Sequence, residues 1–153
     1  MTADDRKIDN QLKLDGIQID DIYSSHEWKK LADDCFSCGV CNVLCPTCFC
    51  FEFKDKVEEN GDGFERTREH SECQLEAFTR VAGDHVFRDK KVDRFKHRIY
   101  HQLKYFKDKF GKTLCVGCGR CMRSCPTRIN FVTGINEMKI KRKNEDAKPL
   151  PSQ

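Results

Sequence analysis

One cysteine motif occurs twice in this sequence, and the repeat constrains the fold more than any other feature. The first copy runs from Cys35 to Pro46 and the second, 80 residues later, from Cys115 to Pro126. Both follow the pattern C-x2-C-x2-C-x3-C-P. Three thiolates spaced two residues apart in a tight loop converge on one centre, whereas the fourth, next to a proline, is directed away from it.

This pattern is typical of [4Fe–4S] clusters, in which the fourth cysteine of each motif binds the other cluster. The sequence therefore predicts two clusters with crossed ligands. The expected ligands of the first cluster are Cys35, Cys38, Cys41 and Cys125, and those of the second are Cys115, Cys118, Cys121 and Cys45. Structural zinc is the alternative, but it usually uses two short C-x2-C pairs and does not explain two full four-cysteine runs.

Composition agrees with a metal-binding chain in a reducing compartment. The 153 residues include eleven cysteines, with 38% hydrophobic and 35% charged residues, enough for one modest core. Neither an apolar leader nor a run of 18 apolar residues is visible, so we expect a cytoplasmic protein without a transmembrane segment. The net charge of +3 gives no compositional sign of nucleic-acid binding. An odd cysteine count also disfavours a disulfide framework.

Three cysteines, Cys48, Cys50 and Cys73, lie outside the two motifs. They are candidates for a third metal centre, a third [4Fe–4S] cluster, with a fourth ligand from His85 or His70 or from a partner subunit. In a strand, C-x-C places both thiols on one face, which suits shared ligation. The alternative is that all three are buried free cysteines, since cysteine packs well in protein interiors.

Hydrophobic spacing predicts the remaining organisation. We expect an N-terminal arm over 1–23, extended around Ile19, and a dicluster domain over 24–140 that contains a linking insert at 51–110. A flexible tail is expected at 141–153. Within the domain, the pattern predicts a helix capped by Ser24 and Glu27, a hairpin at 51–66, helices at 72–82 and 88–110, and a short helix after 128.

The stretch from Arg88 to Lys112 contains ten Lys or Arg and three Asp. Such a basic segment can attract an acidic redox partner, although most charge runs are simply solvated surfaces. His97 and His101 lie one helical turn apart in this segment. They are interpreted as surface or partner-facing histidines, with metal binding as the alternative.

Several runs of residues resemble a known family. They are Cys45-Pro-Thr-Cys-Phe-Cys-Phe, Arg66-Thr-Arg-Glu-His-Ser-Glu-Cys73, Phe78-Thr-Arg-Val-Ala-Gly-Asp-His85-Val-Phe-Arg88, Arg94-Phe-Lys-His-Arg98 and the second cysteine motif. Together, over residues 28–140, they resemble the ferredoxin-like part of iron–sulfur beta subunits of cytosolic nickel–iron (sulf)hydrogenases and of the corresponding iron–sulfur subunits of anaerobic sulfite reductases. The chain departs from the family in having only 34 residues before Cys35, and in His70 where an aromatic residue is typical.

The resemblance implies a mainly α fold with a small β-hairpin, an α-helical-ferredoxin-like dicluster domain. It also implies an electron-transfer subunit between a flavin-containing subunit, which handles NAD(P)H or ferredoxin, and a catalytic subunit of an oxidoreductase complex. Two alternatives stay open: a free ferredoxin-like shuttle, and an enzyme whose third cluster has an open ligand site. No residue is predicted to act as an acid, base or nucleophile.

Overall fold

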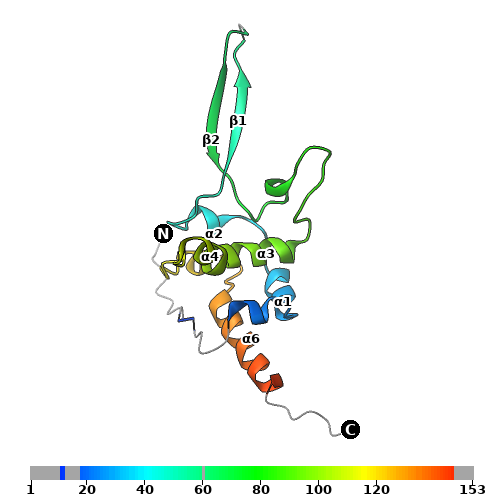
Figure 1. Ribbon diagram of the computed structural model, residues 1–153, viewed down its shortest axis with the longest axis vertical. Coiled ribbons are helices and arrows are strands. Elements are labelled where there is room, and N and C mark those ends of the chain that lie inside the picture. The colour runs from blue at the N-terminus through cyan, green and yellow to red at the C-terminus, as the bar shows by residue number, and fades with distance from the viewer. Residues whose placement is uncertain (1–10, 13–17, 60, 147–153) are drawn as a thin grey trace.

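The computed structural model describes residues 11–12, 18–59 and 61–146. Figure 1 shows a helical body from which a β-hairpin projects at one end and the last helix at the other. The helical elements are η1 (Ile19–Ile22), α1 (Glu27–Asp33), α2 (Val40–Val43), η2 (Glu76–Thr79), α3 (Lys91–Tyr100), η3 (His101–Tyr105), α4 (Phe106–Phe110), α5 (Arg120–Arg123) and α6 (Phe131–Asp146). The strands are β1 (Phe51–Val57) and β2 (Phe64–His70).

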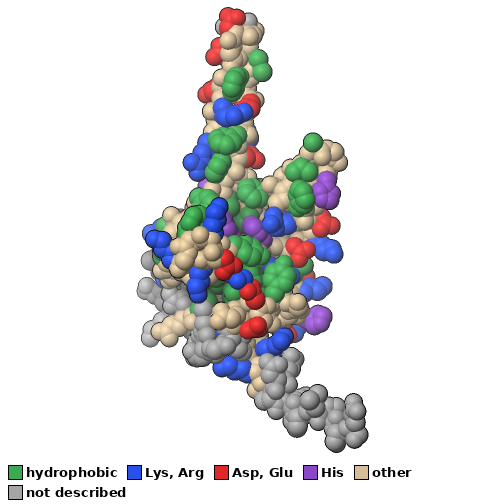
Figure 2. All heavy atoms as spheres, viewed as in Figure 1, with side chains coloured by type: hydrophobic (Ala, Val, Ile, Leu, Met, Phe, Trp, Pro, Cys, Tyr) green, Lys and Arg blue, Asp and Glu red, His purple; other side chains and the backbone are tan. Residues whose placement is uncertain are grey.

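The hairpin confirms the sequence prediction, although its second strand extends further than position 66. Its strands pair antiparallel, from Phe51 opposite His70 to Val57 opposite Phe64. Most of its side chains are exposed on both faces, and Figure 2 shows apolar and charged groups intermixed along it. Cross-strand pairs supply its order, because Arg66 donates to both carboxylate oxygens of Asp55 at 2.6 and 2.7 Å.

The hydrophobic core joins α1, α3 and α6. Trp28, Ile99 and Ile135 are buried there, and η1 adds Ile19 and Ile22. The N-terminal arm was expected to be extended around Ile19; that expectation is wrong, since Ile19–Ile22 forms a 3₁₀ turn packed on the chain's own core. Most of the predicted arm, residues 1–10 and 13–17, lies outside the described residues.

Two buried hydrogen bonds hold this turn in place. The Trp28 indole donates to the carbonyl of Ile22 at 2.8 Å, and the Tyr100 hydroxyl donates to the carbonyl of Ile19 at 2.6 Å. An extended strand at 19–22 would not direct both carbonyls and both isoleucine side chains toward the same core. The two aromatic donors therefore explain why residues 19–22 form a turn, although the weak alternation of apolar residues favours an extended strand.

The long helix predicted over 88–110 begins at Lys91 and runs through α3, η3 and α4. The middle segment, η3, is a π-helix, with a wider turn than the α-helix on either side. Phe95 and Ile99 of the predicted apolar stripe are buried, whereas Phe110 is exposed. The helix predicted after the second motif is α6, in which Ile135 is fully buried.

Three local predictions differ from the structure. Residues 72–82 contain only the short η2 turn, because Arg80 pairs with Val86 in a β-bridge and the predicted apolar face is exposed at Leu75. The helix start is set by Ser25, whose hydroxyl accepts from the amide of Glu27, and no Ser24–Glu27 capping box forms. Finally, α6 continues to Asp146, so the helix extends into the predicted tail.

Within the part of the chain that the structure describes, no helix has both the length and the apolar character needed to cross a membrane.

The Tyr100 hydroxyl gives a test of how η1 is attached. Tyr100→Phe removes the buried donor and leaves the Ile19 carbonyl unpaired, so we expect a loss of about 1–3 kcal/mol in the free energy of unfolding. Urea unfolding under anaerobic conditions measures it. Tyr23→Phe is the matched control, because Tyr23 is 44% exposed and its edge-to-face ring contact with Tyr100 would be retained. Equal losses in both variants would contradict the assignment.

Candidate functional site

The two cysteine loops have matching backbone conformations. Gly39 and Gly119 lie at the N-terminal ends of α2 and α5 with left-handed φ angles of 75° and 72°. Two residues earlier, Ser37 and Gly117 are also left-handed, with φ of 54° and 69°. A backbone with alternate left-handed residues can direct several amides toward one point, which explains glycine at three of these four positions.

Amides and sulfurs also match between the loops. The amide of Ser37 donates to Cys35 Sγ at 3.3 Å, and the amide of Gly117 donates to Cys115 Sγ at 3.4 Å. Amide donation favours the thiolate, the form of cysteine that binds metals. Each loop thus prepares its first cysteine for ligation in the same way.

The fourth cysteine of each motif has a matching partner as well. Cys45 Sγ lies 3.4 Å from Thr47 Oγ1, and Cys125 Sγ lies 3.4 Å from Thr127 Oγ1. The sequence Cys-Pro-Thr is therefore part of the repeat in structure, and the threonine is a contact that the cysteine spacing alone does not reveal.

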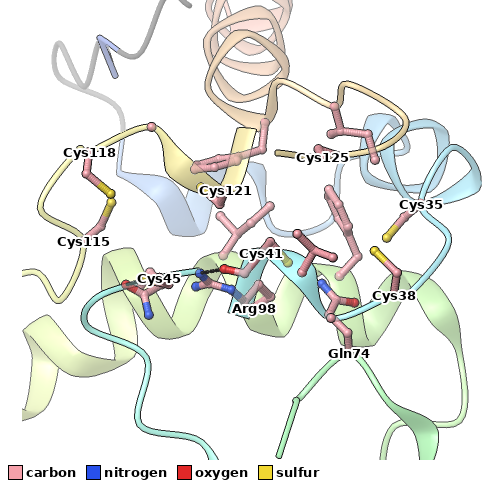
Figure 3. Close-up of a pocket in the computed structure, with 18 of the residues that line it drawn as sticks. Cys35, Cys38, Cys41, Cys45, Gln74, Arg98, Cys115, Cys118, Cys121 and Cys125 are labelled. Atoms are coloured by element: carbon pink, nitrogen blue, oxygen red, sulfur yellow. Dashed lines mark hydrogen bonds between the residues drawn. The ribbon is translucent and has the colours of Figure 1, made fainter. Parts of the chain in front are cut away.

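All eight motif cysteines line one cavity between the loops and α3 (Figure 3). Its other walls include apolar side chains and five polar ones, Thr47, Gln74, Arg98, Gln102 and Thr127. The donor set fits two [4Fe–4S] clusters, since each needs four thiolates and a mostly apolar surround. Because the ligands come from both ends of the chain, binding them would join the two loops.

Electrostatic interactions link the two loops, not only between Cys35 and Cys125 and between Cys121 and Cys45, but also between Cys41 and Cys121, which the predicted crossing assigns to different clusters. Burial raises the pKa of Cys35, and the neighbouring Cys125 thiolate raises it further. Burial also raises the pKa of Cys121, with a further increase from Cys45. The pKa of Cys41 rises to about 11 through burial. Thiols this basic lose their protons when a metal binds, because the cation stabilises the thiolate that burial disfavours.

Arg98 lies against this cavity and not on the surface. Its side chain is 8% exposed, and Nη2 donates to the carbonyl of Cys41 at 2.9 Å (Figure 3). Its charge lowers the pKa values of Cys41 and Cys45 against the effect of burial. Arg98 was counted among the basic residues of a possible docking surface, but the structure places it among the cysteines.

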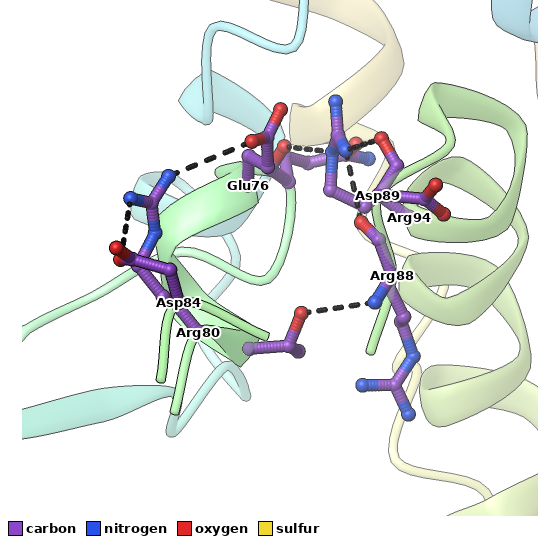
Figure 4. A network of polar contacts seen from close by, with 8 residues as sticks. Glu76, Arg80, Asp84, Arg88, Asp89 and Arg94 are labelled. Atoms are coloured by element: carbon purple, nitrogen blue, oxygen red, sulfur yellow. Dashed lines mark hydrogen bonds and ion pairs between the residues drawn. The ribbon is translucent and has the colours of Figure 1, made fainter. Parts of the chain in front are cut away.

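Arg94 is likewise turned inward. Its Nε donates to the carbonyl of Gln74 at 3.0 Å and its Nη1 to the carbonyl of Arg88 at 2.9 Å. Figure 4 shows this network joining α3 to the loop that carries Arg80 and Asp84. The sequence does contain a signal for the burial of both arginines. Arg94, Arg98 and Gln102 follow one another at four-residue intervals and form one row beside the apolar stripe.

The structure brings Cys48, Cys50 and Cys73 together. Hydrogen bonding between Cys48 and Cys50 is the main cause that raises the pKa of Cys48, and hydrogen bonding with Cys50 is the main cause that lowers the pKa of Cys73. The side-chain amide of Asn42 donates to Cys73 Sγ at 3.3 Å, and Cys41 Sγ lies 3.8 Å from Asn42 Oδ1. These contacts connect the three cysteines to the first motif.

Neither predicted histidine joins the three cysteines. His70 Nδ1 lies 3.9 Å from a carboxylate oxygen of Glu72, and the ring of His85 packs edge-on against Phe87. Among the described residues, no group of three or more His, Cys, Asp or Glu is arranged around a single metal ion.

Comparison with known proteins agrees with this geometry. Residues 34–129 match the family described as the 4Fe–4S dicluster domain. The chain belongs to this family. It binds two [4Fe–4S] clusters and is an iron–sulfur protein of electron transfer. It is also 40% identical over 121 residues to sulfhydrogenase 2 subunit beta of Pyrococcus furiosus, a match that covers 79% of this chain. The resemblance to sulfhydrogenase beta subunits is thereby confirmed.

The match covers only part of the relative. The chain spans 35% of the length of this curated relative. No solved structure matches it. The activity and the assembly of the whole relative are therefore carried over only as a proposal.

His97 and His101 stack on each other, with ring centroids 5.6 Å apart. Burial is the main cause that lowers the pKa of His97 to about 4, and the nearby charges of Arg88 and His101 lower it further. His97 is therefore neutral in the folded protein at neutral pH. Stacked, half-buried rings explain the pair better than metal binding does.

This lowered pKa predicts a pH dependence. The unfolded chain takes up a proton on His97 below about pH 6.5, whereas the folded chain does so only near pH 4. The free energy of unfolding should therefore fall as the pH decreases from 6.5 toward 4. His97→Phe should flatten this slope in anaerobic urea titrations, while His26→Phe, at an exposed position, should not. An unchanged slope in His97→Phe would contradict the burial of this ring.

Proposed function

We propose that the chain is the electron-transfer subunit of a cytoplasmic, multi-subunit oxidoreductase. It would carry electrons between a flavin-containing subunit, which handles NAD(P)H or ferredoxin, and a catalytic subunit. The observation that carries this proposal is the single cavity lined by eight cysteines from two repeated loops. When bound there, the clusters supply one-electron chemistry.

The set of ligands favours a role in electron transfer and not in catalysis. Eight thiolates fill the ligand positions of two clusters, so neither cluster is left with an open position for a substrate. The chain's own residues hold the clusters and donate hydrogen bonds to the ligating sulfurs. The relative's name describes it as a subunit of a sulfhydrogenase, which supports a hetero-oligomer.

The ligand assignment is part of the proposal. Cys35, Cys38, Cys41 and Cys125 are assigned to the first cluster, and Cys115, Cys118, Cys121 and Cys45 to the second. The placement of all eight cysteines around one cavity supports a shared site, and the crossing itself rests on the spacing of the two motifs. An α-helical-ferredoxin-like, mainly α architecture for the domain over 24–140 belongs to the same proposal.

Crossed ligation can be tested with matched cysteine variants. Cys125→Ser and Cys38→Ser should deplete the same cluster, and Cys45→Ser and Cys118→Ser the other. Each variant should lose about half of the iron. Electron paramagnetic resonance spectra of the reduced proteins identify the remaining cluster. A Cys125→Ser spectrum that matches Cys118→Ser would contradict the crossing.

Cys48, Cys50 and Cys73 remain candidates for a third cluster. Their proximity to each other and to Asn42 supports a centre next to the first cluster. The fourth ligand would have to be His70, His85 or a residue of the partner. A third cluster with an open position would favour the alternative of an enzyme.

Iron content separates these possibilities. Two clusters give about eight iron atoms per chain and a third raises this to about twelve. We expect Cys73→Ser to leave iron content unchanged if only two clusters bind. A loss of about four iron atoms would establish the third centre. A mass near that of a single chain in crude extract would favour the free shuttle, and co-purification with a flavin subunit would favour the complex.

A further inference from the structure

Four buried side-chain atoms have no hydrogen-bond partner in the described part of the chain. They are Ser37 Oγ, Gln74 Oε1, Arg98 Nε and Gln102 Nε2. Three of these residues line the cysteine cavity, and Ser37 lies within the first loop. Buried polar atoms are rarely left without a partner, so the three that can donate, Ser37 Oγ, Arg98 Nε and Gln102 Nε2, point to acceptors that belong to the bound clusters.

Arg98 can reach both clusters. It lies on α3 between Cys41 and Cys45, which are assigned to different clusters (Figure 3). Nη2 is already used by the carbonyl of Cys41, and this bond fixes the guanidinium plane and leaves Nε–H as an unused donor. Its charge acts on the thiolates of Cys41, Cys45 and Cys73.

Gln102 is tied to the second cluster alone. Its Oε1 accepts from the Thr47 hydroxyl at 3.2 Å and lies 3.9 Å from Cys45 Sγ, which donates only as a protonated thiol. Once Cys45 is a thiolate ligand, the amide nitrogen of Gln102 is the group that can donate toward it. Its backbone carbonyl accepts from the amide of Cys115 at 3.1 Å. Both cysteines are assigned to the second cluster, and Gln102 is 5% exposed.

We propose that Arg98 and Gln102 set the reduction potentials of the two clusters, Gln102 that of the second cluster and Arg98 those of both. This inference rests on the proposed function. Reduction adds one electron and hence one negative charge to a cluster, and a donor or a cation beside its sulfurs stabilises the reduced form. Removing either residue should therefore lower the potential. Gln74 is not included, because its unpaired atom is an acceptor.

The test is a redox titration of both clusters, followed by electron paramagnetic resonance, on the iron-loaded full chain. Gln102→Leu should weaken the reduced form of the second cluster about tenfold, or 59 mV for a one-electron couple, and leave the first unchanged. Arg98→Met should lower the reduction potentials of both clusters by at least the same amount. Arg98→Lys, which keeps the charge but removes the Nε donor, should shift both by less.

Lys109→Met is the control, because it makes the same change of charge at an exposed position of α4. It should shift neither cluster by more than about a third of the Arg98→Met effect. Iron content confirms loading in each variant. If Arg98→Met does not load, Arg98→Lys and Gln102→Leu decide the result.

The outcomes distinguish the inference from the proposed function. Two reducible clusters whose potentials are unchanged in Gln102→Leu and in the Arg98 variants would overturn the inference and leave the electron-transfer function standing. Equal shifts of both clusters in Gln102→Leu would also overturn it. A wild-type chain that loads two clusters but cannot be reduced, or that does not load them, would overturn the proposed function itself.

Discussion

Hydrogen bonds from one continuous helix to both cysteine loops organise this molecule. Lys91 Nζ donates to the carbonyl of Cys35 at 3.2 Å, and Arg98 donates to the carbonyl of Cys41 at 2.9 Å. One turn further, the carbonyl of Gln102 accepts from the amide of Cys115 at 3.1 Å. Loops that are 80 residues apart in sequence are thus fixed against a single rigid support. The adjacent stripe of the same helix carries Phe95 and Ile99, which belong to the hydrophobic core and also line the cysteine cavity.

This arrangement explains how a polar chain with a small core can hold a precise site. The core secures α3, and α3 in turn secures the cysteines, so the apolar residues act on the site through one element. Metal ligation then adds cross-links between segments that the core does not reach, because thiolates from both loops converge in one cavity. Core and clusters are therefore complementary sources of order.

The cysteine-lined cavity, the hairpin and the long helix could be predicted because each has a local signature. Ligand spacing is dictated by the geometry of the cluster, and the Asn-Gly-Asp-Gly turn and the apolar stripe follow from backbone physics. The 3₁₀ turn at Ile19 and the loop around Arg80 could not, since the turn depends on the distant Tyr100 and the loop on a β-bridge between Arg80 and Val86 that the helical spacing does not show.

The cavity's polar residues were missed for a related reason. Arg98 is a cation in a basic segment, and composition alone assigns such residues to the surface. Only its position in a row with Arg94 and Gln102 beside the apolar stripe indicates burial. The thiolates that Arg98 faces explain why this arginine is buried, because the opposite charges compensate each other.

The amide of Ser71 donates to the carbonyl of Cys50 at 3.2 Å, directly below the projecting hairpin. The chain therefore leaves the body and returns to it at adjacent points. Because the two ends of the hairpin are already held together, its length can change without displacing either cysteine loop. Lengthening a loop also adds little closure entropy. The residues flanking it, Cys50 and Cys73, have no such freedom. The hairpin can thus vary in length, whereas the segments that carry Cys50 and Cys73 must stay in place.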